Sequence, residues 1–290
     1  MRQLSNKHYL FIIILLIIIF IIYFLHTNIM NYTNYNYIIK NNVLSNQNKT
    51  YLNVGIWDNI NNNLQRSQLN MYKKIFYIAE LYKNQKVLET GCGSGEHYLY
   101  WKKLGLKSHI TCFEKSTKPF NKLHNIKYIN FVKNDANNLN IYNYYDKIIS
   151  IESAFHYKNR HLFFQKCYQA LKKGGSLIMA DIFVNNNQSS NYTDTLLKQY
   201  YSQQILNIPR ENIINQETYI HQLKKAGFSV IQVNDISNVS LIPFYQNINK
   251  NINNNNKIYT PTILKKFNEY SSNFIITQKP FAYIFVKCTK

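Results

Sequence analysis

Residues 87–95 read Val-Leu-Glu-Thr-Gly-Cys-Gly-Ser-Gly, an apolar strand that runs directly into Gly91, Gly93 and Gly95. The whole 290-residue chain contains only eight glycines, so three within five positions form a distinct signal. Glycine allows backbone conformations that a Cβ forbids, and it leaves the amides at the start of the following helix open to a ligand. The stretch therefore predicts a strand, a ligand-binding turn and a helix.

The spacing of the three glycines distinguishes this turn from the glycine-rich turn that binds nicotinamide dinucleotides. The dinucleotide fingerprint is Gly-x-Gly-x-x-Gly, whereas these glycines alternate and follow an acidic residue, Glu89. Acidic-x-Gly-x-Gly-x-Gly resembles motif I of the class I S-adenosylmethionine-dependent methyltransferases. The resemblance implies that Glu89 and the loop, with Thr90 and Cys92, hold the methionine end of S-adenosylmethionine. The alternative is an ordinary tight turn between a strand and a helix.

A second strand is predicted at 109–113, and it ends in Glu114 about 20 residues after the glycine turn. A carboxylate at the tip of this strand can accept hydrogen bonds from both hydroxyls of a ribose. Glu114 is therefore the predicted ribose ligand, with Lys115 beside it in the same predicted site. A solvent-exposed glutamate is the alternative.

A third strand, predicted at 126–132, leads into Lys-Asn-Asp-Ala. This segment resembles the family's adenine-binding segment, which implies that Asp135 meets the adenine amino group and that a neighbouring backbone amide, at Ala136, meets a ring nitrogen. A fourth strand is predicted at 145–151, and Glu152 follows it directly. Because open α/β sheets bind ligands at the carboxyl ends of their strands, Glu152 joins the predicted cofactor site.

The remaining elements follow the order of the same family. Apolar residues at helical spacing predict a helix at 161–171, which the glycines at 174–175 end, and a fifth strand at 176–182. A final strand is predicted at 281–287. The resemblance implies an α/β fold, a Rossmann-like, seven-stranded, mostly parallel sheet with helices on both faces.

The segments at 51–57 and 208–236 are similar to small-molecule methyltransferases that act on tocopherol-like quinols, sugars, sterols and amines. Without its first 50 residues the chain retains about 240, which suits one α/β domain. The predicted organisation is a domain at 51–290, with the cofactor half at 85–183, substrate-covering segments at 51–84 and 184–217, and a polar insert at 246–257 that is expected to be a surface loop.

The chemistry follows from the cofactor. A sulfonium methyl group is already activated, so the protein mainly aligns the acceptor and excludes water. His156, just past the fourth strand, is the candidate base or acceptor-orienting residue because its pKa suits neutral pH; a capping or packing histidine is the alternative. Tyr157 and His97 are weaker candidates. The sequence shows no cluster of metal ligands, so no metal is predicted.

Residues 9–25 run almost without interruption through Ile, Leu and Phe and contain no charge, glycine or proline. Such a length lies at the short limit for a membrane-spanning helix. The pattern favours an uncleaved membrane anchor over a signal peptide, whose apolar part usually has about 7–15 residues and precedes a small-residue cleavage site. The predicted order is a tail at 1–8, the anchor at 9–25 and a polar tether at 26–50.

The orientation of the anchor is weakly determined. Basic residues before the span outnumber Lys40 after it, which places the short N-terminus in the cytosol and the domain across the membrane. S-adenosylmethionine, however, is made in the cytosol. The cysteines show no paired spacing, and Cys92, Cys112 and Cys167 are interpreted as small buried apolar side chains. The side of the membrane stays open.

The chain has 34 Lys and Arg against 14 Asp and Glu, a formal net charge of +20. Clustered basic residues would indicate nucleic-acid binding, because they neutralise phosphates. Here the basic residues are scattered and nearly all are lysine, so nucleic acid is not the expected partner. Attraction to anionic lipid headgroups beside the anchor is the favoured use of the charge.

Three interpretations remain at this stage. The leading one is a membrane-tethered methyltransferase (EC 2.1.1) that acts on oxygen, nitrogen or carbon of a small or lipid-like acceptor. The second is a methyltransferase of RNA or protein, which a separate recognition domain or an amino-methylating motif after the fourth strand would support; the sequence contains neither. The third is a non-catalytic, membrane-held, cofactor-binding interaction protein. The sequence predicts neither the acceptor nor the oligomeric state.

Overall fold

The computed structural model divides the chain into two compact units, Met1–Val43 and Leu44–Lys290. The described residues are 45–46, 49–51, 53–58, 63–115, 128–185, 195, 198–199, 201–254 and 272–290. The predicted anchor at 9–25 lies outside them. None of the helices within these described ranges combines the length and the apolar character that a membrane crossing requires. Within the predicted tether, two short antiparallel strands pair, β1 (Ser45–Asn46) and β2 (Lys49–Thr50).

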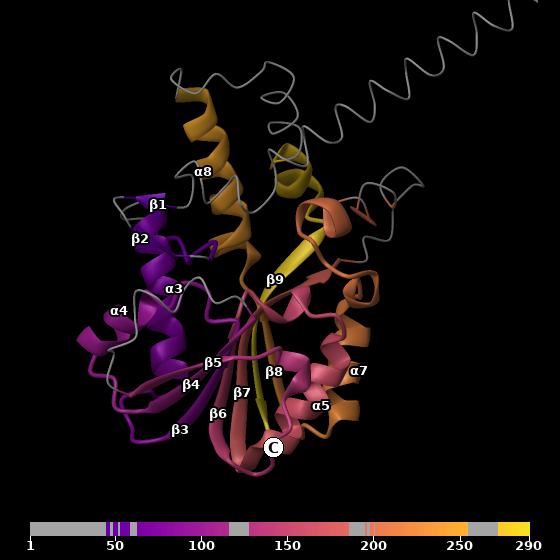
Figure 1. Ribbon diagram of the computed structural model, residues 1–290. Coiled ribbons are helices and arrows are strands. Elements are labelled where there is room, and N and C mark those ends of the chain that lie inside the picture. The colour runs from indigo at the N-terminus through magenta and orange to yellow at the C-terminus, as the bar shows by residue number, and fades with distance from the viewer. Residues whose placement is uncertain are drawn as a thin grey trace, which may run out of the picture. The chain divides into compact units, whose positions relative to one another are not determined.

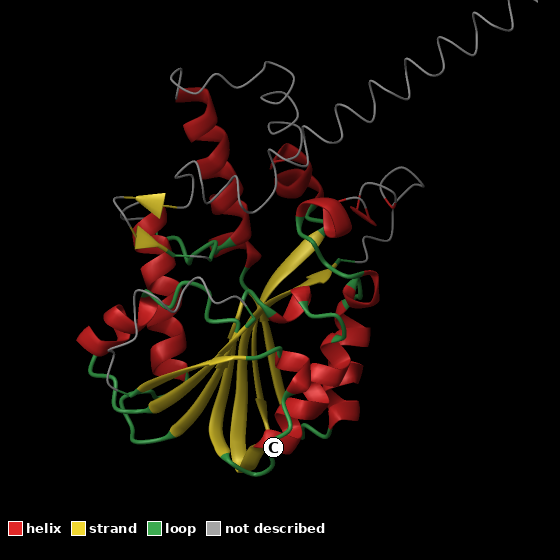
Figure 2. Cartoon of the chain, in the orientation of Figure 1, coloured by secondary structure: helices red, strands yellow, loops and turns green. Residues whose placement is uncertain are grey.

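A seven-stranded sheet is the central element of the second unit (Figures 1 and 2). Its order is β5-β4-β3-β6-β7-β9-β8, and β9 alone runs antiparallel to its neighbours. The strands are β3 (Lys86–Thr90), β4 (His109–Glu114), β5 (Ile129–Lys133), β6 (Tyr145–Ile151), β7 (Leu171–Val184), β8 (Val230–Asp235) and β9 (Phe281–Thr289). The predicted sheet is confirmed, and the fourth strand has its predicted bounds.

The strand order places the glycine turn at the point where the sheet reverses direction. From β3, the chain adds β4 and β5 on one side and then β6 and β7 on the other. In open α/β sheets, such a switch point leaves a crevice at the carboxyl ends of the strands, and ligands bind there. The turn at 91–95 leaves the carboxyl end of β3 and therefore lies at this crevice.

Helices cover both faces of the sheet (Figure 1). Residues of α3 (Leu64–Ile78) and α4 (His97–Lys103) share one hydrophobic core with alternate strand residues, while α5 (Arg160–Ala170) and α7 (Gln216–Ala226) share the other. Successive strand residues point to opposite faces, which is why neighbours such as Val87 and Leu88 enter different cores. The predicted helices on both faces are confirmed.

Asparagine, so abundant in this chain, begins three of these helices. Asn63, Asn159 and Asn215 precede α3, α5 and α7, and each side chain accepts a hydrogen bond from a backbone N–H in the first turn. This is the capping that the first turn of a helix requires. Gly227, in a left-handed conformation at φ +114°, ends α7.

Two expectations about local structure are wrong. The polar insert at 246–257 was expected to be a loop, but α8 extends over Leu241–Asn254. Leu241, Phe244 and Ile248 recur at helical spacing, and the first two are buried, so packing at the beginning of α8 outweighs the weak helix propensity of asparagine. The glycines at 174–175 do not end a helix. They lie in an irregularity near the start of β7, where the pairing with β6 shifts register.

Gly55 lets the segment at 53–58 lie directly against α3. Its φ is +82°, and a Cβ there would lie 2.6 Å from the carbonyl carbon of Ser67 and 2.9 Å from the amide nitrogen of Gln68. These are backbone atoms of α3, so they cannot move aside as a flexible side chain would. Val54, the residue before Gly55, donates its amide to Glu152, so this contact with α3 also positions the hydrogen bond to the sheet.

We expect Gly55→Ala to lower the free energy of unfolding by more than about 3 kcal/mol, because it adds a steric clash to an unfavourable backbone conformation. The matched control is Gly105→Ala, where φ is also positive (+90°) but no heavy atom lies within 4 Å of the added carbon. It should lose only about 1–2 kcal/mol. Equal losses for both variants in urea denaturation would contradict the proposed contact.

Candidate cofactor and methyl-transfer site

The turn after β3 needs its glycines. Gly91, Gly93 and Gly95 all have positive φ values, between +56° and +69°. The amide of Gly91 donates to the carbonyl of Phe113 at 2.7 Å, which folds the turn back onto β4. A Cβ on Gly91 would lie 1.8 Å from Oγ of Ser153, so a side chain cannot be placed there without moving the loop after β6.

Glu89 and Thr90 lie buried at the carboxyl end of β3. The Glu89 carboxylate lies 3.1 Å from Nε2 of His97, the first residue of α4, and both side chains are only 2% exposed. The His97 ring also stacks on Tyr72, with ring centroids 4.6 Å apart. His97, a weaker base candidate in the sequence, is therefore a buried partner of Glu89. The predicted contact of Glu89 and Thr90 with the methionine end of the cofactor stays a prediction.

Glu114 ends β4 beside the glycine turn. The amide of Gly93 donates to Oε2 of Glu114 at 3.1 Å. The predicted ribose ligand and the bare backbone of the turn are thus neighbours across 21 residues of sequence. This contact places a hydrogen-bonding carboxylate where a nucleoside would lie against the glycines.

The interpretation of Cys92 and Cys112 as small buried side chains missed that they are paired. Cys92 in the turn and Cys112 in β4 form a disulfide, while Cys167 and Cys288 are free and buried. The sequence showed no paired spacing because the two cysteines meet only when the turn folds back: Cys112 lies opposite Glu89 in the parallel register, and Cys92 returns toward it. Cys92, predicted as a cofactor-binding residue, is thereby tied to the neighbouring strand.

Lys115 and Asp135 meet across the ends of β4 and β5. Lys115 Nζ lies 3.6 Å from Oδ2 of Asp135, although the lysine side chain is 84% exposed. Oδ1 of Asp135 accepts from the amide of Asn137 at 2.9 Å and begins the short 3₁₀ helix Ala136–Asn138. The pair lies at the same edge of the sheet as Glu114, as the predicted adenine and ribose contacts require. Their role as ligands stays a prediction.

Glu152 follows β6 in a left-handed conformation at φ +50°. Its Oε1 accepts hydrogen bonds from the amide of Val54, at 2.8 Å, and from the hydroxyl of Tyr283 in β9. Burial raises the pKa of Glu152 to about 7, and the two hydrogen bonds oppose that rise. Glu152 thus joins the predicted substrate-covering segment at 51–84 to the sheet, and it carries a proton that is exchangeable near neutral pH.

Tyr157 lies beside the glycine turn. Its hydroxyl accepts from Oγ of Ser153 at 2.8 Å and would lie 3.3 Å from a Cβ on Gly91. Burial raises the pKa of Tyr157, so its hydroxyl keeps its proton at neutral pH and is a poor general base.

His156 lies at the end of the 3₁₀ helix Ala154–His156, and its Nδ1 lies 3.1 Å from the carbonyl oxygen of Asn207. His156 is exposed by surface area, yet the protein atoms around its ring desolvate it and lower its pKa. The neutral imidazole, which is the form a base requires, is therefore favoured.

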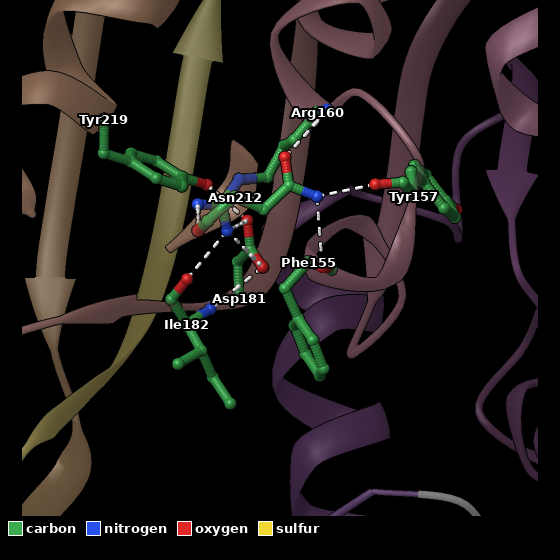
Figure 3. Close-up of polar contacts among 7 residues, drawn as sticks. All are labelled: Phe155, Tyr157, Arg160, Asp181, Ile182, Asn212 and Tyr219. Atoms are coloured by element: carbon green, nitrogen blue, oxygen red, sulfur yellow. Dashed lines mark hydrogen bonds and ion pairs between the residues drawn. The ribbon is translucent and has the colours of Figure 1, made fainter. Parts of the chain in front are cut away.

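A buried polar network next to these residues was missed in the sequence (Figure 3). Arg160 and Asp181 form an ion pair with both side chains fully buried. The backbone carbonyl of Asn212 accepts from the guanidinium and the hydroxyl of Tyr219 donates to Asp181, while Nε of Arg160 is buried without a hydrogen-bond partner. Arg160 is one of only four arginines in a lysine-rich chain, which is the one signal that could have pointed to it. Across the described residues, no group of three or more His, Cys, Asp or Glu is placed to hold a metal ion.

The strand order and the glycine turn at the switch point give the Rossmann-like fold that class I S-adenosylmethionine-dependent methyltransferases have. Residues 88–179 match the family model described as "Methyltransferase domain". The matched region contains the turn, the loop after β6 and the four predicted carboxylate ligands, Glu89, Glu114, Asp135 and Glu152. The chain is thus similar in fold and in sequence to methyltransferases of small molecules.

Two curated relatives and one solved structure illustrate this similarity. Erythromycin 3''-O-methyltransferase of Saccharopolyspora erythraea is 26% identical over 207 residues, 67% of each chain. Phosphoethanolamine N-methyltransferase of Plasmodium falciparum is 28% identical over 182 residues, 61% of this chain and 65% of the relative. A Haemonchus contortus phosphoethanolamine N-methyltransferase bound to S-adenosylhomocysteine superposes with a TM-score of 0.63 at 18% identity, and covers 76% of this chain but 52% of its own. This chain thus spans about half of that enzyme.

The disulfide gives a direct test. Peptide mapping without reductant should recover Cys92 and Cys112 as a linked pair, with Cys167 and Cys288 available to alkylation after unfolding. Reductant should lower the free energy of unfolding by about 3 kcal/mol, because the bond closes a loop of about 20 residues in the unfolded chain. A double variant, Cys92→Ala with Cys112→Ala, should show no such dependence. Alkylation of Cys92 and Cys112 without prior reduction would contradict the pairing.

The raised pKa of Glu152 predicts a pH dependence of stability. Between pH 4.5, its ordinary pKa, and about 7, the folded protein holds a proton that the unfolded chain has released. Stability should therefore fall as pH rises through this window, by up to about 3 kcal/mol. Glu152→Gln keeps the neutral form at every pH and should remove this part of the slope. Identical pH slopes for wild type and variant in urea denaturation would contradict the assignment.

Proposed function

We propose that the protein transfers the methyl group of S-adenosylmethionine to a small or lipid-like acceptor by in-line displacement at the carboxyl edge of the sheet. The observation that carries this proposal is the hydrogen bond from the Gly93 amide to the Glu114 carboxylate. It joins an acidic side chain and a bare glycine turn at the switch point, which is the combination that a nucleoside with free ribose hydroxyls requires.

We assign the ends of three neighbouring strands to the cofactor. Glu114 receives the ribose, Asp135 and the backbone at Ala136 receive the adenine, and Glu89 with the turn receives the methionine end. Lys115 Nζ lies 3.6 Å from Oδ2 of Asp135, so the ends of β4 and β5 lie side by side. This proximity supports the assignment of ribose and adenine to neighbouring strand ends. The sulfonium methyl then points toward the loop after β6.

We assign the loop after β6 to the acceptor. The sulfonium is an activated donor, so the rate depends on alignment and on exclusion of water more than on covalent catalysis. His156, with its lowered pKa, takes a proton from an acceptor that must lose one. Tyr157 keeps its own proton and fixes the loop through Ser153. Glu152 joins the covering segment and β9 to this loop through Val54 and Tyr283, and its predicted contact with the cofactor stays a prediction.

The class of acceptor rests on the relatives. Those two curated relatives are named for erythromycin and phosphoethanolamine, both small molecules. Along the sequence the lysines are scattered, whereas phosphate-backbone binding would favour clustered basic residues. A small acceptor, methylated on oxygen, nitrogen or carbon, is the proposal that these observations support.

We also propose that residues 9–25 anchor the protein in a membrane. The support is the uncharged apolar sequence of this segment and the excess of basic residues before it. The Cys92–Cys112 disulfide favours a domain on the oxidising side, since such bonds persist outside the reducing cytosol. Protease treatment of sealed membrane vesicles tests the orientation: digestion of the domain in vesicles with their cytosolic face outward would overturn it.

Titration of S-adenosylmethionine and S-adenosylhomocysteine into the full-length protein in detergent should show binding in the micromolar range. Gly93→Arg should weaken it by at least about 100-fold, because the side chain fills the turn and removes the left-handed conformation at φ +56°. Gly105→Arg is the matched control, since Gly105 also has positive φ but no heavy atom lies within 4 Å of an added Cβ.

The control should bind like the wild type. If a folded wild-type protein binds neither compound, the activity fails and the non-catalytic, membrane-held interaction protein becomes the leading interpretation. If Gly93→Arg binds as well as Gly105→Arg, the cofactor lies elsewhere.

A further inference from the structure

The side chain of Asn212 connects two segments that lie 55 residues apart in the sequence. Asn212 ends the short 3₁₀ helix Arg210–Asn212 and is 3% exposed. Its amide nitrogen donates to two carbonyl oxygens, that of Phe155 at 3.2 Å and that of Tyr157 at 2.6 Å. Figure 3 shows this nitrogen pointing toward both residues. These carbonyls belong to the residues on either side of His156.

Asn212 is itself held by Arg160. Oδ1 of Asn212 accepts from the Arg160 amide at 3.1 Å, and the backbone carbonyl of Asn212 accepts from the guanidinium at 2.9 Å. The guanidinium also donates to the Asp181 carboxylate, at 3.2 and 3.3 Å, and to the carbonyl of Ile182 at 2.7 Å. The hydroxyl of Tyr219 donates to Asp181 at 2.7 Å. The side-chain oxygen of Asn212 accepts one hydrogen bond and the side-chain nitrogen donates two, so the orientation of the Asn212 amide is fixed.

The same segment reaches His156 a second time. The carbonyl of Asn207 lies 3.1 Å from Nδ1 of His156, so residues 207–212 contact both the ring and the backbone around it. On the opposite side, Tyr157 leads through Ser153 to the glycine turn at Gly91. The position of His156 relative to that turn therefore depends on how residues 207–212 hold the loop.

We propose that Asn212 is a positioning residue for methyl transfer: by holding the carbonyls that flank His156, it sets the distance and direction of the imidazole from the cofactor turn. This inference rests on the proposed function of His156. Asparagine is suited to the task because one side chain supplies the acceptor for Arg160 and the donors for two carbonyls, whereas aspartate supplies no donor when it is ionised. The charged groups of this cluster are Asp181 and Arg160, which form an ion pair. The charge of Asp181 raises the pKa of His156, but desolvation is the larger effect and lowers it.

The first test is the titration of His156 in the full-length protein, followed by NMR of the histidine ring protons and assigned with His156→Asn. In the wild type, desolvation lowers the pKa of His156. Asn212→Ala releases the loop into solvent and should move that pKa upward, toward its ordinary value. Asn215→Ala is the control: it is the same substitution three residues further along the chain and removes the hydrogen bond that caps α7 at Thr218, without touching the loop.

The control should leave the titration of His156 unchanged. Asn212→Ser keeps one hydroxyl donor and should give an intermediate shift. An unchanged His156 titration in Asn212→Ala, or an equal shift in Asn215→Ala, would overturn the proposal. If neither variant at 212 folds, hydrogen exchange in the wild type tests the proposal instead. The proposal requires the side-chain amide protons of Asn212 to be protected from exchange. Rapid exchange of those protons in the folded protein overturns it.

The second test separates this proposal from the proposed function. With any acceptor that the wild type methylates, Asn212→Ala should lower kcat at least about tenfold, while the Kd for S-adenosylhomocysteine changes less than about threefold. Equal losses in kcat for Asn212→Ala and Asn215→Ala would indicate a structural role alone. A shifted His156 titration in a protein that binds no S-adenosylhomocysteine would support the contact and overturn the proposed function instead.

Discussion

The buried ion pair between Arg160 and Asp181 is the interaction on which the arrangement of the site depends. Both side chains are withdrawn from water, so each charge is tolerable only while its partners stay in place. Those partners come from the start of α5, the end of β7 and the segment that carries Asn212 and Tyr219. A single electrostatic requirement therefore joins three separate stretches of chain next to the carboxyl edge of the sheet. These three stretches position the loop after β6, because Asn212 donates to two of its carbonyl oxygens.

The carboxylates of the site differ because their surroundings differ. Glu152 is desolvated and receives only two hydrogen bonds, so its pKa rises to about 7. Asp135 begins a 3₁₀ helix and faces a lysine at the exposed edge of the sheet. Glu114 contacts the amide of the turn. Placement on strand ends brings these groups together, and burial raises the pKa of Glu152.

Prediction from the sequence succeeded where local pattern and family order agree. The glycine turn, the strand at 145–151 and the helix that begins near Arg160 carry strong local signals, and the structure confirms them. It failed at the insert after 246, because asparagine-rich composition indicates a loop while the apolar spacing from Leu241 supports a helix. The roles of the predicted ligands remain predictions, although the strand ends bring Glu114, Lys115 and Asp135 to one edge.

The sequence by itself determined the class of fold, since alternating glycines after a buried strand and acidic residues after the next strands are local features with fixed spacing. Only the tertiary structure decided which distant residues meet. Cys92 reaches Cys112 because the turn folds back on β4, and Asn212 reaches the carbonyls around His156 because two segments pack at one sheet edge. Such contacts form between residues tens of positions apart when the chain folds. In a chain with so many asparagines, nothing in the sequence around Asn212 indicates that it makes them.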